Sequence, residues 1–297
     1  MGMLNKPSSR RSMMKKVAAT AVAAMVGENL FAHVSASEAA LGPLKGRINN
    51  SVCKWCYNAI PLEDFCLAAK KMGITGLDLI GPKDWAIVKK HGLTVALADG
   101  AGKGINQGFN DPLLHDELVK SYEDLIPKAA EAGISQIICF SGTRKGLDDE
   151  QGIKNCVAGL KRLMPTAEKY NVTIVMELLN SKVDHRDYQC DHTKWGVAVC
   201  EGVGSDRFKL LYDIYHMQIM EGDVIATIKK YNKYFSHYHT AGVPGRHEID
   251  ETQELNYPAI MKAIVDTGFK GFVAQEFIPI REDKLASLKQ SIEICDV

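Results

Sequence analysis

The chain has 297 residues, of which 46% are hydrophobic and 24% are charged, and its formal net charge is zero. This composition is that of a soluble globular protein, long enough for one large core or two modest ones. The neutral balance of charge gives no electrostatic footprint for nucleic acid or an anionic membrane, and we expect neither as a partner. Beyond the N-terminal segment, no run approaches the roughly 20 apolar residues of a membrane span.

Residues 1–41 differ from the rest of the chain. Arg10 and Arg11 precede an apolar stretch, Val17–Val26, and small residues follow it. This order predicts a twin-arginine export signal, and hence a periplasmic or cell-envelope protein. The alternative is a short N-terminal amphipathic helix in a cytoplasmic protein. We expect residues 1–41 to add nothing to the fold and residues 42–297 to form one catalytic domain.

From Asn49 onward, short apolar runs alternate with segments of helical periodicity. Strands are predicted at Ser51–Trp55, Gly76–Ile80, Thr94–Ala98, Gln136–Phe140, Thr173–Glu177, Phe208–Asp213, Phe235–Thr240 and Gly271–Phe277. Helices are predicted at Pro61–Met72, Asp84–His91, Pro112–Ala132, Glu150–Tyr170, Asp191–Gly202, Asp223–Tyr231, Tyr257–Thr267 and Lys284–Ile294. Eight strand–helix units in about 250 residues predict an α/β fold, a single (β/α)₈ TIM barrel. A doubly wound open sheet is the alternative.

The chain has eight cysteines, and several lie inside apolar runs, as Cys139 does in "IICF". A buried thiol there acts as a small hydrophobic group. The even number permits disulfides in an exported protein, although a chain of this length does not need them. Cys53 and Cys56 form a lone C-x-x-C pair, so a zinc ribbon is not expected, and no thioredoxin-like context supports a redox role.

Four polar residues, Glu177, Asp213, His239 and Glu276, each lie at the far end of a predicted strand. Because the carboxyl ends of barrel strands meet at one mouth, we expect these side chains to converge. Three carboxylates and an imidazole are suitable ligands for one divalent cation. Each residue alone has a plainer interpretation, as a solvated strand-end carboxylate or a packed histidine, but four on successive strands favour a metal site.

Other residues are expected near the same mouth. His216 is placed in a loop just beyond the sixth predicted strand, and Arg246 follows a Gly-Pro-Gly-like turn that can aim its guanidinium into the site. Trp55 and Tyr57, at the end of the first predicted strand, are expected to wall the pocket, with core-edge packing as the alternative. The glycine-rich "DGAGKGINQGFN" lacks the phosphate-loop pattern and is interpreted as a flexible active-site loop.

Three segments carry a family resemblance: "YDIYHMQIMEGD" (212–223), "HYHTAGVPGRHE" (237–248) and "NYPAI" (256–260). They resemble hydroxypyruvate isomerases, members of the xylose isomerase-like superfamily of metal-dependent barrels, which also contains the ketose 3-epimerases. The resemblance implies one cation bound by a Glu, an Asp, a His or Gln and a second Glu, and a role for His216 and Arg246 in holding substrate oxygens. It implies the ligand set Glu177, Asp213, His239 and Glu276.

One departure concerns His239, because hydroxypyruvate isomerases tend to have Gln at the third metal position. A histidine there is typical of the ketose 3-epimerases. For this ligand set the expected cation is Mn²⁺ or Mg²⁺, with Co²⁺ or Zn²⁺ as alternatives. Barrels of this superfamily commonly form homo-oligomers.

The hypothesis for the chemistry is isomerisation of a small sugar or hydroxy-keto acid through a cis-enediolate, with Glu177 and Glu276 as base and acid. Epimerisation at C3 of a ketose, through the same intermediate, is the alternative within this class. Two alternatives stay open. The first is an exported barrel that binds carbohydrate without catalysis. The other alternative is metal-dependent phosphodiester hydrolysis in an endonuclease IV-like barrel, which would need further histidine ligands: His185, His192, His237 and His247.

Overall fold

The structure is a computed structural model, and it describes residues 42–297. The predicted export signal at residues 1–41 lies outside the described residues. Within 42–297, no helix is both long enough and apolar enough to cross a lipid bilayer.

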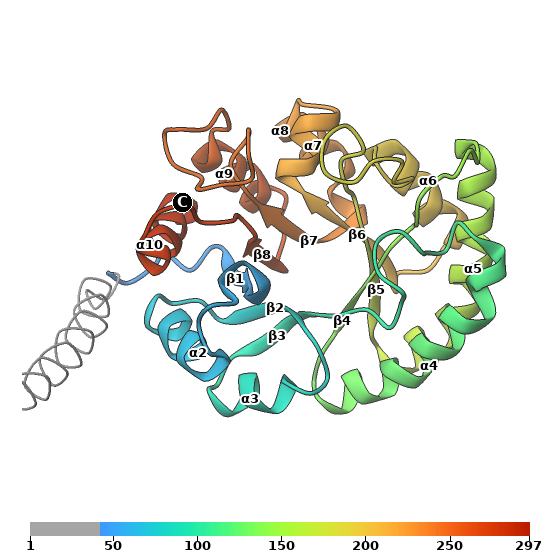
Figure 1. Cartoon of the computed structure of the whole chain (residues 1–297), viewed down its shortest axis with the longest axis horizontal. Helices are drawn as coiled ribbons and strands as arrows, with labels where there is room; N and C mark the ends of the chain where they lie inside the picture. Colours follow the sequence, from blue (N-terminus) through green and yellow to red (C-terminus); the bar gives the residue numbers. More distant parts are fainter. Residues whose placement is uncertain (1–41) are drawn as a thin grey trace, which may run out of the picture. The chain divides into compact units, whose positions relative to one another are not determined.

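Eight parallel strands close into a barrel in which each strand pairs with its neighbours in chain order (Figure 1). The last strand returns to the first through pairs such as Ser51 with Ala274. The predicted (β/α)₈ barrel is therefore confirmed and the open sheet is wrong. The strands are β1 (Asn49–Cys53), β2 (Gly76–Ile80), β3 (Thr94–Ala98), β4 (Gln136–Cys139), β5 (Thr173–Glu177), β6 (Phe208–Asp213), β7 (Phe235–Thr240) and β8 (Phe272–Gln275).

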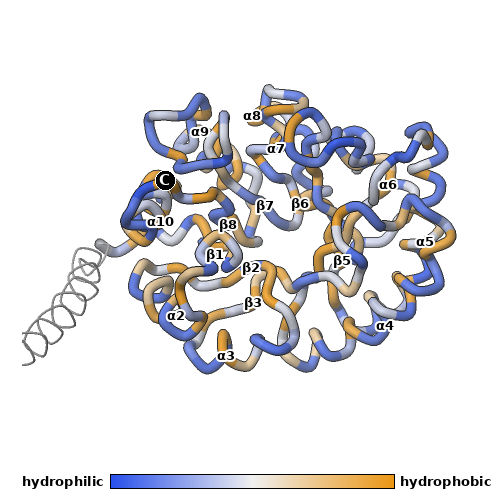
Figure 2. Tube along the Cα trace, in the orientation of Figure 1, coloured by the Kyte–Doolittle hydropathy of each residue, from blue (hydrophilic) through white to orange (hydrophobic). Residues whose placement is uncertain are grey.

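Helices surround the barrel (Figure 1). They are α2 (Leu62–Lys71), α3 (Trp85–Lys90), α4 (His115–Glu131), α5 (Asp149–Tyr170), α6 (Thr193–Val203), α7 (Ile214–Met220), α8 (Val224–Tyr231), α9 (Tyr257–Asp266) and α10 (Lys284–Cys295), with short 3₁₀ turns η1 (Lys54–Tyr57), η2 (Pro112–Leu114) and η3 (Asn232–Tyr234). Along the helices, hydrophobic and hydrophilic residues alternate (Figure 2). In α5 the buried positions include Cys156, Leu160 and Leu163, the spacing of one apolar face turned toward the sheet.

Three differences from the prediction lie near the strand ends that carry the polar residues. β1 ends at Cys53, so Trp55 and Tyr57 lie in the 3₁₀ turn η1 and not at the end of a strand. β8 ends at Gln275, which leaves Glu276 one residue beyond it. Residues 214–220, expected as a loop, form α7, because the Asp213 side chain accepts a hydrogen bond from the His216 backbone N–H and caps the helix.

The interior of the barrel has two different halves. Leu97, Ile138, Val175 and Leu211, from β3 to β6, form an apolar cluster of their own. The other strands contribute polar side chains to the interior, among them Asp78, His237 and His239, all fully buried. Since buried polar groups are costly unless they are paired, the polar half points to a role other than stability.

All eight cysteines are buried and unpaired. The thiols therefore take the place of small hydrophobic groups in the core, as their sequence context predicts.

Candidate metal centre and substrate pocket

Four side chains converge at the carboxyl ends of β5 to β8. One ligand atom from each of Glu177, Asp213, His239 and Glu276 lies within 4.8 Å of the others, and all four side chains are buried. Strand register explains the convergence, because Asp213 lies beside His239, and Ala274 of β8 lies beside His239 on its other side. The structure brings together the four residues singled out in the sequence as metal ligands.

His239 orders this cluster through its two ring nitrogens. Its Nδ1 faces the carboxylates, at 2.9 Å from Glu276 Oε2, 3.3 Å from Glu177 Oε1 and 4.0 Å from Asp213 Oδ2. Its Nε2 faces the opposite way, 3.3 Å from Asp78 Oδ2. If Nε2 donates to Asp78, the lone pair of Nδ1 is left for a ligand on the carboxylate side, the usual arrangement around a metal-binding histidine.

Asp78 also bonds His237, the residue two positions before His239 on β7. His237 and His239 lie on one face of their strand, with their rings 5.3 Å apart. Burial raises the pKa of Asp78, but the two histidines outweigh burial and hold this pKa well below its usual range. Asp78 is therefore an ionised acceptor inside the barrel.

The cluster fits a divalent cation. Glu177 Oε1 and Asp213 Oδ2 are buried and accept no hydrogen bond from any described residue. Leaving charged oxygens in that state is costly, and a cation at the point where they meet would satisfy them. With all three carboxylates ionised and His239 neutral, as metal ligands are, the one guanidinium of Arg246 leaves two negative charges, which a divalent cation would balance.

The carboxylates influence each other's ionisation. Burial and the neighbouring Glu276 raise the pKa of Asp213 to about 8. Burial also acts to raise the pKa of Glu276, but the charges of His239 and Arg246 hold this pKa well below its usual range. Without a cation, one carboxylate of the pair keeps a proton while the other is ionised.

Arg246 reaches the cluster from the loop after β7, as the sequence predicts. Its Nη2 lies 2.6 Å from Glu276 Oε2, and its guanidinium stacks between the rings of Trp55 and Tyr215, at 5.3 and 5.6 Å. The loop is anchored by Glu248, which accepts hydrogen bonds from the backbone of the β8–α10 loop and from Ser287. This anchorage holds the guanidinium in a fixed position at the edge of the cluster.

The two aromatic residues of η1 have different environments. The Trp55 indole N–H donates to Glu276 Oε1 at 2.9 Å, so Trp55 belongs to the site. Tyr57 is 1% exposed and packs against Phe65 and Phe277. Its contacts are those of a core residue, the alternative given for it, and it does not line the pocket described below.

His216 lies in the first turn of α7 and is fully buried. Its Nε2 is 3.7 Å from Asp213 Oδ2 and has no hydrogen-bond partner among the described residues. Its Nδ1 is 2.6 Å from Nδ2 of Asn180, which the sequence analysis did not single out. Burial and the positive charge of Arg246 hold the pKa of His216 well below its usual range, so the ring is neutral.

The remaining histidines do not form a second centre with the first. Among the described residues, the groups suited to a metal are the four-residue cluster and a second set, Cys53, Asp78 and His239, that shares His239 with it. His192 bonds Asp191, His247 bonds the Ile278 carbonyl, and His185 lies with its ring 5.3 Å from that of His216. The further histidine ligands of the nuclease-like alternative are therefore not found in the described part of the chain.

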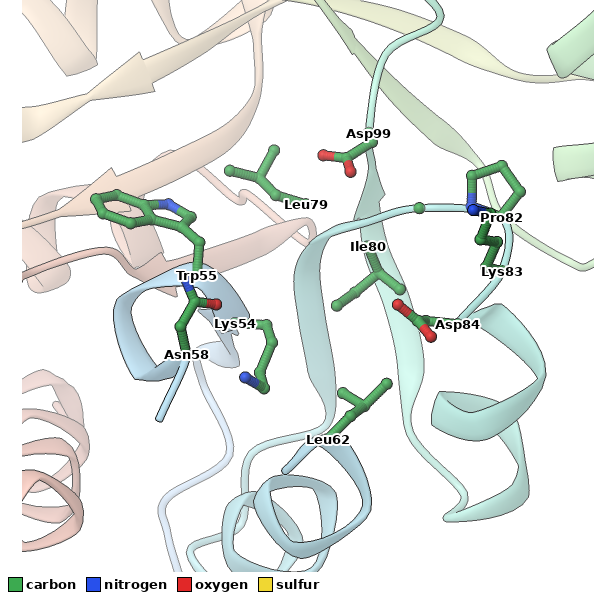
Figure 3. A pocket seen from close by; sticks show the side chains of 11 residues that line it. Lys54, Trp55, Asn58, Leu62, Leu79, Ile80, Pro82, Lys83, Asp84 and Asp99 are labelled. Carbon is green, nitrogen blue, oxygen red and sulfur yellow. The ribbon is translucent and has the colours of Figure 1, made fainter. Parts of the chain in front are cut away.

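A pocket of about 490 Å³ opens beside Trp55, at the ends of β2 and β3 (Figure 3). Its charged lining residues are Lys54, Lys83, Asp84 and Asp99. Trp55 is common to the pocket and the cluster, because its ring lines the first while its N–H bonds Glu276 in the second. Desolvation raises the pKa of the Asp99 carboxyl.

The glycine-rich segment after β3 lies beside this region and is closely packed at two points. A side chain at Gly100 or Gly108 would collide with the backbone carbonyl of Ile138 or Phe140, at 2.4 or 2.2 Å from its Cβ. These two glycines let the loop pass directly over the end of β4.

The fold and the cluster at the carboxyl ends of its strands together define a TIM-barrel enzyme. The chain belongs to the xylose isomerase-like TIM barrel family, whose model matches residues 68–296.

Named relatives agree with this family and with the resemblance to hydroxypyruvate isomerases. A putative hydroxypyruvate isomerase of Drosophila melanogaster is 27% identical over 197 residues, 65% of this chain and 74% of that one. A 2-oxo-tetronate isomerase of Haemophilus influenzae is 26% identical over 234 residues, 75% of this chain and 90% of that one. The D-psicose 3-epimerase of Clostridium cellulolyticum H10, solved with D-tagatose, shares the fold with a TM-score of 0.70 at 16% identity, covering 84% of this chain and 100% of that one.

Proposed function

We propose that the chain is a metal-dependent isomerase of a hydroxy-keto acid or small sugar, acting through a cis-enediolate. The observation that carries the proposal is the pair Glu177 and Glu276, which flank His239 Nδ1 at 3.3 and 2.9 Å. Two carboxylates around one point can remove a proton from one carbon and return it to its neighbour. The isomerase names of the relatives support the same reaction class.

The hydrogen bonds of the two glutamates indicate which of them is the base that removes the proton from carbon. Both oxygens of Glu276 are occupied, Oε1 by Trp55 and Oε2 by Arg246, whereas Glu177 Oε1 accepts nothing. Glu177 is therefore the better placed base. It takes the proton from the carbon that bears the hydroxyl group, the C–H electrons form the enediolate double bond, and the carbonyl π electrons move to oxygen. Glu276, which starts as a carboxylate, takes up the hydroxyl proton as the new carbonyl forms and delivers it to the former carbonyl carbon. The proton held by Glu177 then passes to the former carbonyl oxygen, which becomes the new hydroxyl group and leaves both glutamates ionised.

Glu177, Asp213, His239 and Glu276 would hold the cation, with Mn²⁺ or Mg²⁺ expected first and Co²⁺ or Zn²⁺ as alternatives. When bound, the cation supplies Lewis-acid stabilisation of the charge that develops on the substrate oxygens. Arg246 and the unpartnered Nε2 of His216 are donors at the edge of the cluster for the same oxygens.

The pocket beside Trp55 gives room for the part of the substrate beyond the reacting carbons. Lys83, Asp84 and Asp99 line it without a side-chain hydrogen bond or ion pair to any other described residue. Free charged groups of both signs suit hydroxyl groups, which donate as well as accept.

The test is hydrogen exchange in D₂O, followed by NMR with Mn²⁺-activated protein that is then chelated for the measurement. The substrate panel runs from hydroxypyruvate through four-carbon keto acids to ketohexoses. Deuterium at the carbon next to the carbonyl, together with movement of the carbonyl, supports isomerisation. Deuterium absent throughout would contradict the proposal and favour a barrel that only binds carbohydrate.

A ketose 3-epimerase is the second candidate, and His239 at the third ligand position favours it. The same spectra distinguish the two reactions. An epimerase would introduce deuterium at C3 and invert that centre while the carbonyl stays at C2.

Substitution of the two glutamates tests their roles. Glu177→Gln and Glu276→Gln keep the side-chain shape but remove the proton acceptor, so each should lower kcat by several orders of magnitude, within the ~10²- to 10⁴-fold range of general acid–base catalysis or beyond it. Glu221→Gln is the matched control, because Glu221 bonds Thr193 outside the cluster. A glutamine variant of either residue that kept more than about a tenth of the turnover would show that its carboxylate does not carry the proton.

A further inference from the structure

The amide of Asn180 makes every hydrogen bond that its side chain can make. Oδ1 accepts from the backbone N–H of Val183 at 3.0 Å and of Asp184 at 2.9 Å. Nδ2 lies 2.6 Å from Asp184 Oδ2 and 2.6 Å from His216 Nδ1. Asn180 is fully buried.

These contacts fix which way the amide points. Two backbone N–H groups need an acceptor, so the atom facing them is the oxygen, and the atom facing His216 is the NH₂ group. A donor at 2.6 Å requires a lone pair on His216 Nδ1. In a neutral ring the proton then resides on Nε2.

His216 Nε2 points toward the metal cluster with its proton unused. It lies 3.7 Å from Asp213 Oδ2, beyond hydrogen-bond distance, and has no partner among the described residues. A buried donor left free beside the reacting point is suited to an oxygen of the substrate. The opposite tautomer would present a lone pair there, and it would repel that oxygen.

We propose that Asn180 is a positioning residue that holds His216 in the Nε2–H tautomer, so that His216 donates a hydrogen bond to a substrate oxygen beside the cation. The tautomer is a property of the protein alone, whereas the bond to a substrate oxygen rests on the proposed function. Asn180 lies three residues after Glu177, so one short segment carries both the proposed base and the group that orients the proposed donor.

The first part of the test needs no turnover. Two-dimensional ¹⁵N–¹H spectra of the histidine rings, recorded on the full chain with Mg²⁺ and again with EDTA, report the tautomer of each ring. The His216 signals are assigned by their loss in His216→Gln. We expect a pyridine-type Nδ1 and a protonated Nε2, and a protonated Nδ1 in the wild-type protein would overturn the proposal whatever the activity.

The second part uses Asn180→Asp and Asn180→Ala. In Asn180→Asp the atom facing His216 becomes an acceptor, so Nδ1 should gain a proton, and kcat/KM should fall roughly 10- to 100-fold, the effect of one hydrogen bond to a group that gains charge. Asn110→Asp is the matched control, since Asn110 is buried and donates two hydrogen bonds of 2.7 Å but contacts no histidine through them. It should leave the His216 tautomer unchanged.

The outcomes separate this proposal from the proposed function. An Nε2–H tautomer that changes in Asn180→Asp, in a protein with no isomerase activity on any substrate of the panel, would uphold the positioning role and reject the reaction. Unchanged tautomer and unchanged kcat/KM in both Asn180 variants would reject the positioning role in an active enzyme.

Discussion

Trp55 links the pocket to the proposed reaction at the scale of a single residue. Its ring lines the pocket, stacks on Arg246 and directs its N–H to Glu276 Oε1. The hydrogen bond holds one oxygen of a proposed acid–base group in place, and the ring determines what fits beside it.

Trp55→Phe keeps an aromatic ring but removes that donor. A hydrogen bond to a charged acceptor contributes about 1.5–3 kcal/mol, so kcat/KM should fall roughly ten- to hundredfold. Trp195→Phe is the control, because the Trp195 indole bonds the Asp149 carbonyl at 3.2 Å, away from the cluster. Steady-state kinetics on both variants checks the prediction, which fails if the two variants lose equal activity.

Asp78 acts on the cluster from inside the barrel through His239 Nε2. Asp78→Asn removes the charge that favours the Nδ1 lone pair, and loss of such an outer partner typically weakens metal affinity about 10- to 100-fold. Calorimetric titration with Mn²⁺ measures the affinity directly. Thr240→Val, which removes a buried 2.8 Å hydrogen bond from Thr240 of β7 to Gln275 of β8, is the control for general destabilisation.

The four cluster residues could be predicted because each ends an apolar run, and parallel strands bring such ends together. Asp78 and Asn180 could not be predicted in this way. Asp78 lies in the middle of "GLDLI", and its partner His237 is 159 residues away. Asn180 follows its strand in a loop, and its role depends on which backbone N–H groups turn toward it. Both roles depend on the orientation of side chains, to which hydrophobic periodicity is insensitive.

At the scale of elements, the barrel and its order followed from the alternation of apolar runs and helical segments, while the boundaries near the site did not. α7 is the clearest case. A seven-residue helix gives little periodic signal, and it forms here because Asp213, at the end of β6, caps its first turn. The same side chain is a proposed metal ligand, so the local structure and the site depend on one carboxylate.

The loops after β4 and β5 are joined by an ion pair between Arg144 and Asp191. Two nitrogens of the guanidinium lie 2.9 and 3.1 Å from the two carboxylate oxygens, and Ser181 and His192 also bond Asp191. Burial acts to raise the pKa of Asp191, but these partners lower it by a larger amount, so the pKa lies below its usual value. The charged form of Asp191 is therefore the one that stabilises the folded state.

Asp191→Asn should lower the free energy of unfolding by about 1–3 kcal/mol at neutral pH. A carboxyl group with a depressed pKa stabilises the folded state at pH values above its unfolded-state pKa of about 3.9. This stabilisation is lost as the pH falls through the folded-state pKa, so the difference in the free energy of unfolding between wild type and Asp191→Asn should shrink below about pH 4. Urea unfolding at stepped pH values measures it. Asp149→Asn, which removes an exposed partner of the same arginine, should cost less than about 1 kcal/mol.

At the scale of the whole molecule, the ligand set at the mouth, once its carboxylates are ionised and His239 is neutral, carries two negative charges beyond the charge that Arg246 balances. A cation that binds only the folded chain adds stability, about 2.7 kcal/mol at a hundredfold excess over Kd. For a domain of this size the Tm should rise by roughly 5–10 °C with Mn²⁺ and return with EDTA. Asp213→Asn should abolish most of the rise, and NaCl at matched ionic strength should not reproduce it.

The eight buried thiols can be used to detect local opening of the barrel. They lie in or beside β1, β4, α2, α5, α6 and α10, and each is at most 7% exposed while the barrel is closed. The rate at which an alkylating reagent modifies each cysteine is then set by how often that part of the barrel opens. Mass spectrometry of the partly modified protein would rank the strands and helices by their local lifetimes, with no label introduced into the sequence.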